Sequence, residues 1–351
     1  MEKQKSLHVA DDNPYLNYDA LVEACDKIFG KRQAISYQEF KKLTEESYRI
    51  DMEEYARLHN FTDSVKLTEY FSYIRTKIEQ SIPEKSRTDR IIVVGCGQGR
   101  LSEVYIALAK KMGVKKITFN DLIESHVEQT KNKIQKLYNS NGFEADGVKI
   151  EYLPGDILTV DVSEMFDAMF LIWYVSAEFV NPESAQKMVE TRRQIYTKFR
   201  DILIPGGALI EDIPDPNMEP GFYRIGNVKT AHILEQRKIL LGQHQNMLLS
   251  NWTCEQKEGF PYQLRYTPRN GTDVKEKEST GFVLKKTESM SIPLKSTLGT
   301  DVVLPIIRDS QNMDEVLNLL RQIRLTSVTF PSMSKLDQKR RKMTYWEKSA
   351  D

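Results

Sequence analysis

The chain has 351 residues, of which 40% are hydrophobic, enough for a sizeable buried core and too many for wholesale disorder. Its 50 Lys and Arg residues balance its 50 Asp and Glu residues, so the formal net charge is zero. A protein that mainly binds a phosphate backbone usually has a basic surplus, so this balance disfavours a nucleic acid as the main partner.

Cysteine usage and hydropathy indicate the compartment. The three cysteines are widely separated, the five histidines do not cluster, and no metal-binding or disulfide pattern is present. We therefore expect no metal site and a reducing environment. The first residues are polar, and the longest apolar stretch, residues 168–175, is far shorter than the roughly 20 residues of a membrane helix. These features predict a cytoplasmic protein that does not enter the membrane.

Residues 1–85 are predicted to form a helical N-terminal cap. Ser36-Tyr37-Gln38-Glu39 has the capping-box pattern, in which the serine caps a helix and the glutamate reaches back. Apolar residues at helical spacing follow, among them Leu67, Ile74 and Ile78. Residues 83–89 then read as a connection.

From residue 90 the pattern changes to alternating strands and helices. Residues 91–94 form a continuous β-branched run, as expected of a strand buried on both faces. A glycine loop and an apolar helical pattern follow, and Gly113 is placed for a left-handed helix end. Further strands are expected at residues 117–120, 148–153, 168–173 and 208–211. This alternation predicts an α/β fold with a doubly wound, mostly parallel sheet, which binds ligands beyond the carboxyl ends of its strands.

The second half of the chain is predicted to complete this core. Residues 213–250 read as a helical insertion after the fifth strand, a lid over the core. Closing strands are expected at 281–293 and 302–307, and a last helix at 314–323. We expect the core to span 86–330, followed by a polar tail, 331–351, whose basic run Lys339-Arg340-Arg341-Lys342 is a solvated terminus.

The glycine loop Gly95-Cys96-Gly97-Gln98-Gly99 carries the clearest functional signal. Glycines directly after a buried strand let the backbone approach a ligand, and the following helix points its N–H groups at that ligand. A dinucleotide fingerprint, G-x-G-x-x-G, would need its third glycine where this chain has Arg100. The alternative is a glycine turn without a ligand.

From about residue 90 to 212 the chain resembles the class I S-adenosylmethionine-dependent methyltransferases. Asp121 in Phe119-Asn120-Asp121-Leu122 matches the family's acidic residue that holds the ribose hydroxyls. Asp156 and Ile157 in Pro154-Gly155-Asp156-Ile157 match the element beside the adenine ring. Each has a plainer alternative: Asp121 as a helix cap, and Gly155-Asp156 as an ordinary turn.

The resemblance implies S-adenosylmethionine as the cofactor. The positive sulfonium favours an aromatic face, and Trp173 or Tyr174 could provide one or simply belong to the core. Many family members have an acidic residue two positions before the first glycine, where this chain has Val93. The resulting set of expected cofactor contacts is Gly95, Cys96, Gly97, Gly99, Asp121, Leu122, Asp156, Ile157 and Trp173.

The sequence limits the possible classes of substrate mainly by exclusion. The fourth strand ends in Trp173-Tyr174-Val175-Ser176, which is not the motif of amino methyltransferases acting on DNA bases, and the cysteine nucleophile of pyrimidine C5 methylation is missing. Glu178 lacks the partner that protein arginine methyltransferases have. We expect O- or N-methylation of a small molecule, with His232 or His244 as a candidate base. An RNA or protein side chain as substrate, and a catalytically silent interaction protein, remain alternatives.

Overall fold

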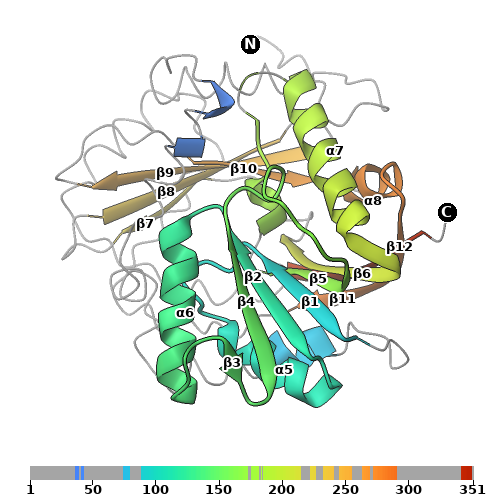
Figure 1. Ribbon diagram of the computed structural model, residues 1–351. Coiled ribbons are helices and arrows are strands. Elements are labelled where there is room, and N and C mark those ends of the chain that lie inside the picture. The colour runs from blue at the N-terminus through green and yellow to red at the C-terminus, as the bar shows by residue number, and fades with distance from the viewer. Residues whose placement is uncertain are drawn as a thin grey trace, which may run out of the picture.

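The computed structural model describes residues 36–38, 41–42, 74–79, 88–172, 175–181, 183, 185–214, 222–226, 232–240, 245–254, 263–268, 272–290 and 341–349. A layered α/β core accounts for most of them (Figure 1). Of the expected N-terminal cap, the described residues 37–38, 41–42 and 74–79 are helical, and the rest of it lies outside the described residues apart from Ser36. None of the helices in the described part of the chain has the length and apolar content that crossing a membrane needs.

The core is an eight-stranded sheet with the order β11-β12-β6-β5-β1-β2-β4-β3. Strands β4, β2, β1, β5 and β6 are parallel, whereas β12 is antiparallel to both β6 and β11, and β3 is antiparallel to β4. The chain moves outward from β1 in both directions, so the doubly wound, mostly parallel sheet is confirmed. The strands are β1 Arg90–Val94, β2 Lys116–Asp121, β3 Glu144–Ala145, β4 Val148–Pro154, β5 Phe166–Leu171, β6 Leu203–Pro214, β11 Phe282–Met290 and β12 Arg341–Lys348.

Helices cover both faces of this sheet (Figure 1). On one face, α5 (Ser102–Met112), α6 (Glu124–Tyr138) and the helical residues 74–79 share a hydrophobic cluster with alternate strand residues. On the other face, α7 (Ala185–Ile202) and α8 (Thr272–Glu278) pack against the second cluster.

Local sequence explains the first strand and helix. Ile91 and Val93 belong to one cluster and Ile92 and Val94 to the other, which is why β1 is a continuous apolar run. Helix α5 ends at Gly113, whose φ of 71° lies in the left-handed region that glycine adopts without steric cost. Both elements were predicted and both are confirmed.

The prediction of a helical insertion at residues 213–250 is wrong. After β6 the described residues form a four-stranded antiparallel sheet in the order β10-β9-β8-β7. The apolar residues of this stretch were assigned to a helix, but strand formation depends on the neighbours that each side chain meets in the sheet, as in the pairing of β8 with the next strand β9. The strands are β7 Phe222–Gly226, β8 His232–Leu240, β9 Gln245–Cys254 and β10 Gln263–Pro268.

This second sheet lies beyond the carboxyl ends of the parallel strands (Figure 1). Its strand β10 contacts the short 3-10 helix η1 (Val175–Glu178), which comes shortly after the carboxyl end of β5. The segment thus has the location expected of a lid, although its secondary structure is different.

The prediction of a solvated tail at residues 331–351 is also wrong over β12. This strand pairs with β6 on one side and β11 on the other, and Met343, Tyr345 and Trp346 are almost fully buried. Charged residues at both ends of the strand gave the segment its polar composition. The expected strand at 281–293 is confirmed as β11, whereas the expected elements at 302–307 and 314–323 lie outside the described residues.

Candidate functional site

The glycine loop lies where β1 ends, next to the end of β2. Gly95, Gly97 and Gly99 all have positive φ, at 68°, 55° and 74°. The Cys96 N–H donates to the Asn120 carbonyl of β2 at 2.9 Å, which ties the loop to the neighbouring strand. Helix α5 starts directly afterwards without a side-chain cap, which favours a ligand at its first N–H groups.

The three glycines differ in what surrounds them. A Cβ at Gly95 would lie 2.7 Å from a methyl of Val175, and a Cβ at Gly99 would lie 2.9 Å from the Thr130 Cα. Both positions therefore need glycine for close packing. A Cβ at Gly97 would meet nothing within 4 Å among the described residues, so its backbone is the part of the loop that a ligand can approach.

Asp121, the last residue of β2, holds this loop in place. Its Oδ2 accepts the Gly97 N–H at 2.8 Å, and its Oδ1 accepts the Ile123 N–H at 2.9 Å. The carboxylate is buried, with His126 Nδ1 3.4 Å from Oδ1. Each carboxylate oxygen can accept a further hydrogen bond, so the structural role leaves capacity for a ligand hydroxyl.

Two polar residues that the sequence analysis missed complete the framework. The buried Asn120 amide donates to the carbonyls of Leu153 (2.7 Å) and Gly155 (3.0 Å), joining the end of β2 to the turn after β4. The Thr130 hydroxyl of α6 donates to the Gly97 carbonyl at 2.9 Å. A buried asparagine at the end of an apolar strand was the one sequence signal for the first of them.

Asp156 forms the turn after β4. Its Oδ1 accepts the Leu158 N–H at 3.0 Å, and its carbonyl accepts the N–H groups of Thr159 and Val160. The turn interpretation of this residue therefore holds in the structure, alongside any part in binding. Ile157 is 6% exposed and belongs to the second hydrophobic cluster, so only a small part of its side chain is accessible to a ligand.

The N-terminal segment reaches this turn. Lys41 Nζ forms an ion pair with Asp156 Oδ2, with both side chains largely buried. The Tyr37 ring lies 5.1 Å from Lys41 Nζ, and the Tyr37 N–H donates to Glu183 Oε1 at 2.8 Å. Burial, and then the Asp156 charge, raise the pKa of Tyr37 to about 12, so its hydroxyl stays protonated at neutral pH. Neither Lys41 nor Glu183 was predicted to lie near the site.

Cys96 is part of the loop but is not a reactive thiol. Burial, followed by the neighbouring Asp121 charge, raises the pKa of Cys96 well above its usual range. Its Sγ lies 3.7 Å from Thr130 Oγ1. A thiol that stays protonated at neutral pH is a poor nucleophile, so the residue serves the loop through packing and its backbone.

The remaining predicted residues are placed only in part. Leu122 is 37% exposed beside Asp121, and His232 is the first residue of β8, paired with Cys254 of β9. Trp173, Tyr174 and His244 lie outside the described residues. Within the described residues, no group of three or more His, Cys, Asp or Glu side chains could hold a metal ion.

Comparison with known proteins gives structural matches only. No family model and no curated protein sequence matches the chain. Among solved structures, a S-adenosylmethionine-dependent methyltransferase from Clostridium acetobutylicum ATCC 824 is 10% identical, covers 95% of this chain and 99% of its own, and has a TM-score of 0.45. The CcbJ methyltransferase from Streptomyces caelestis is 12% identical, covers 80% of this chain and 90% of its own, and has a TM-score of 0.46.

A third match is CalS10, an amino pentose methyltransferase from Micromonospora echinaspora involved in calicheamicin biosynthesis. It is 12% identical, covers 84% of this chain and 97% of its own, and has a TM-score of 0.42. Similarity at these levels does not carry an activity from one protein to another.

Proposed function

We propose that the protein transfers a methyl group from S-adenosylmethionine to an oxygen or nitrogen of a small-molecule substrate. The observation that carries this proposal is the open backbone of Gly97, held by the Asp121 carboxylate where strands β1 and β2 end. In a doubly wound sheet this edge, next to the point where the chain reverses direction, is where nucleotide-like ligands bind.

The residues present fit the cofactor. The open Gly97 position gives space for the methionine part near the α5 N-terminus, and Asp121 retains acceptor capacity for the ribose hydroxyls. Asp156, in the turn after the adjacent strand β4, would accept from the adenine amine. Leu122 is exposed beside them, and Trp173 remains our candidate for the aromatic face that favours the sulfonium.

The bound cofactor would supply an activated methyl group, which the acceptor attacks in line. The protein's task is then to position the acceptor and exclude water, and a base is needed only for a protonated acceptor. The second sheet and the Lys41 segment lie beyond the strand ends, where they would cover the acceptor. His232 and His244 remain the candidate bases.

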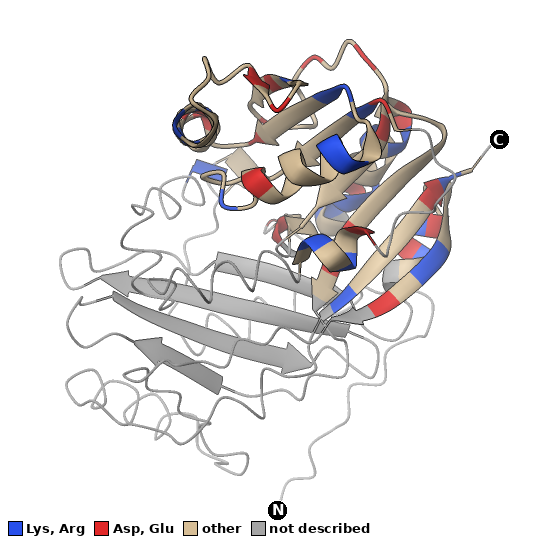
Figure 2. Ribbon diagram, turned by 90° about the horizontal axis from the view of Figure 1, so that it is seen from below, with Lys and Arg blue, Asp and Glu red and all other residues tan. Residues whose placement is uncertain are grey.

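The alternatives have less support. Over the described core, Lys and Arg residues are interspersed with Asp and Glu (Figure 2), an arrangement that does not favour a phosphate backbone as the partner. A nicotinamide-dependent oxidoreductase would need a glycine at Arg100, and it would continue with a sixth parallel strand where this sheet has the antiparallel β12.

The scattered cysteines support a reducing compartment, and we place the protein in the cytoplasm.

The activity is tested by incubating the protein with S-adenosylmethionine and panels of small amines, alcohols and phenols, and measuring S-adenosylhomocysteine. We expect the protein to release S-adenosylhomocysteine only when one class of acceptor is present. His232→Ala and His244→Ala, assayed on that acceptor, identify a base if either substitution lowers kcat. Release that depends instead on added RNA or protein would establish the alternative substrate class, and cofactor binding without any transfer would indicate a silent protein.

A further inference from the structure

The 3-10 helix η1 forms one wall of the glycine loop. The methyl groups of its first residue, Val175, would lie only 2.7 and 2.8 Å from a Cβ added to Gly95. Nothing larger than glycine fits between them, so the position of η1 and the position of the loop depend on each other. The same short helix contacts β10 of the second sheet, on the side where an acceptor would enter.

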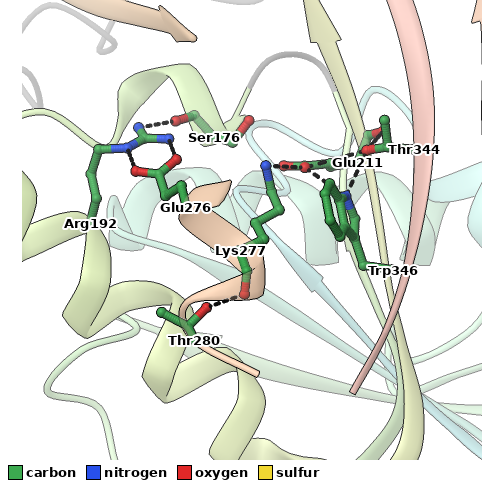
Figure 3. A network of polar contacts seen from close by, with 8 residues as sticks. All are labelled: Ser176, Arg192, Glu211, Glu276, Lys277, Thr280, Thr344 and Trp346. Atoms are coloured by element: carbon green, nitrogen blue, oxygen red, sulfur yellow. Dashed lines mark hydrogen bonds and ion pairs between the residues drawn. The ribbon is translucent and has the colours of Figure 1, made fainter. Parts of the chain in front are cut away.

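Arg192 of α7 binds backbone carbonyl groups in and just after η1. Its Nη1 donates to the Ser176 carbonyl at 2.8 Å (Figure 3). The same Nη1 donates to the carbonyl of Phe179, the residue after η1, at 3.1 Å. A one-turn helix leaves such carbonyls without partners of its own. One planar guanidinium therefore ties a residue of this turn and the residue that follows the turn to α7.

Glu276 of α8 fixes the guanidinium in turn. Arg192 Nε and Nη2 donate to the two carboxylate oxygens at 2.5 and 2.8 Å, a bidentate pair whose side chains are 1% and 6% exposed (Figure 3). The desolvation cost of a buried pair commonly offsets its attraction, and apolar replacements of similar size are often as stable. Stability alone is therefore a weak reason for placing this pair here.

We infer that Arg192 is a positioning residue that sets the wall of the cofactor loop through η1, with Glu276 orienting it. The chain of contacts runs from Glu276 to Arg192, to the carbonyl groups of η1, to Val175 and to Gly95. This inference rests on the proposed function, because the loop is taken to bind S-adenosylmethionine. If η1 moves, Val175 no longer packs against Gly95, and the contact of η1 with β10 beside the acceptor space changes as well.

The test uses the double variant R192M/E276M, which removes the pair without leaving a buried charge unpaired. We expect a cooperatively folded protein whose Kd and KM for S-adenosylmethionine rise about tenfold or more. V175A should weaken binding in the same way while leaving the ion pair intact, and its effect should not add to that of the double variant. R192K keeps the charge but lacks the planar fork, so its Kd for S-adenosylmethionine should lie between those of the wild type and the double variant.

The control for a loss of stability alone is K277M, which breaks the neighbouring buried pair of α8 with Glu211 and leaves that carboxylate without its lysine (2.7 Å; Figure 3). This substitution should lower the Tm and leave the cofactor Kd unchanged. If the wild type binds no S-adenosylmethionine, the proposed function fails. If the wild type binds and the folded double variant or R192K binds equally well, the positioning role is refuted and the pair is merely structural.

Discussion

At the scale of single residues, Asp121 holds the glycine loop, and we propose that it also accepts hydrogen bonds from the cofactor. Its carboxylate accepts N–H groups from Gly97 and Ile123, so it shapes the loop before any ligand arrives. A substitution should therefore change stability and cofactor affinity together.

We expect Asp121→Asn to lower the free energy of unfolding by about 1.5–3 kcal/mol, because the amide NH₂ would face one of two buried N–H donors. S-adenosylmethionine affinity should fall at least about tenfold. Denaturant unfolding and calorimetry measure the two effects. Asp161→Asn, at an exposed aspartate in the loop after β4, is the control and should change neither. Unchanged stability in Asp121→Asn would show that the carboxylate does not hold the loop.

At the scale of elements, the N-terminal segment is joined to the site by the Lys41–Asp156 ion pair. We expect Lys41→Met to increase the dissociation rate of the cofactor several-fold. The covering segment loses this attachment, while the carboxylate oxygens of Asp156 are still present to accept hydrogen bonds. Stopped-flow measurement of cofactor release tests this, with the adjacent exposed Lys42→Met as the matched control. Tighter binding by Lys41→Met would instead show that the lysine competes with the adenine amine.

A second prediction at this scale concerns the pairing of β2 with β4. Burial alone would raise the pKa of Glu151, but hydrogen bonds from Lys116 and Lys149 outweigh it and lower the pKa below its ordinary 4.5. A lowered folded-state pKa means that the stabilisation is fully present above the unfolded value and is lost as the pH falls through the folded value. Glu151 is 35% exposed, so the contribution is at most about 1 kcal/mol.

Glu151→Gln should therefore lower the Tm at neutral pH, and the difference from wild type should shrink as the pH falls below 4.5. Thermal unfolding across this range measures it, with the exposed Glu144→Gln as the control. A Tm difference that persists unchanged in acid would mean that charge is not its cause.

At the scale of the whole molecule, the features that depend on short stretches of sequence were predicted correctly. The β-branched run of β1, the glycines after it and the helix end at Gly113 each depend on a few neighbouring residues, and all were found as expected. The resemblance to a known family placed Asp121 at the end of the second strand and Asp156 just after the next one, and the structure has them at the end of β2 and after β4.

Features that depend on distant contacts were missed. Strand β12 is buried because β6, more than 120 positions earlier in the chain, and β11 lie on either side of it. The ion pairs of Lys41 with Asp156 and of Arg192 with Glu276 join residues 115 and 84 positions apart. No periodicity or spacing in the chain indicates such partners, so they became visible only in the folded structure.

The central claim is that the Gly97 backbone faces S-adenosylmethionine, and calorimetry tests it most directly. We expect S-adenosylmethionine and S-adenosylhomocysteine to bind with micromolar affinity, about −8 kcal/mol, and NAD not to bind. Gly97→Arg should abolish binding, whereas Gly147→Arg should keep it, because Gly147 has a left-handed backbone and open surroundings too but lies in the β3–β4 turn, at the amino end of β4 and away from the carboxyl ends of the parallel strands. No binding of either adenosyl compound to the wild type, or equal binding by Gly97→Arg, would contradict the account.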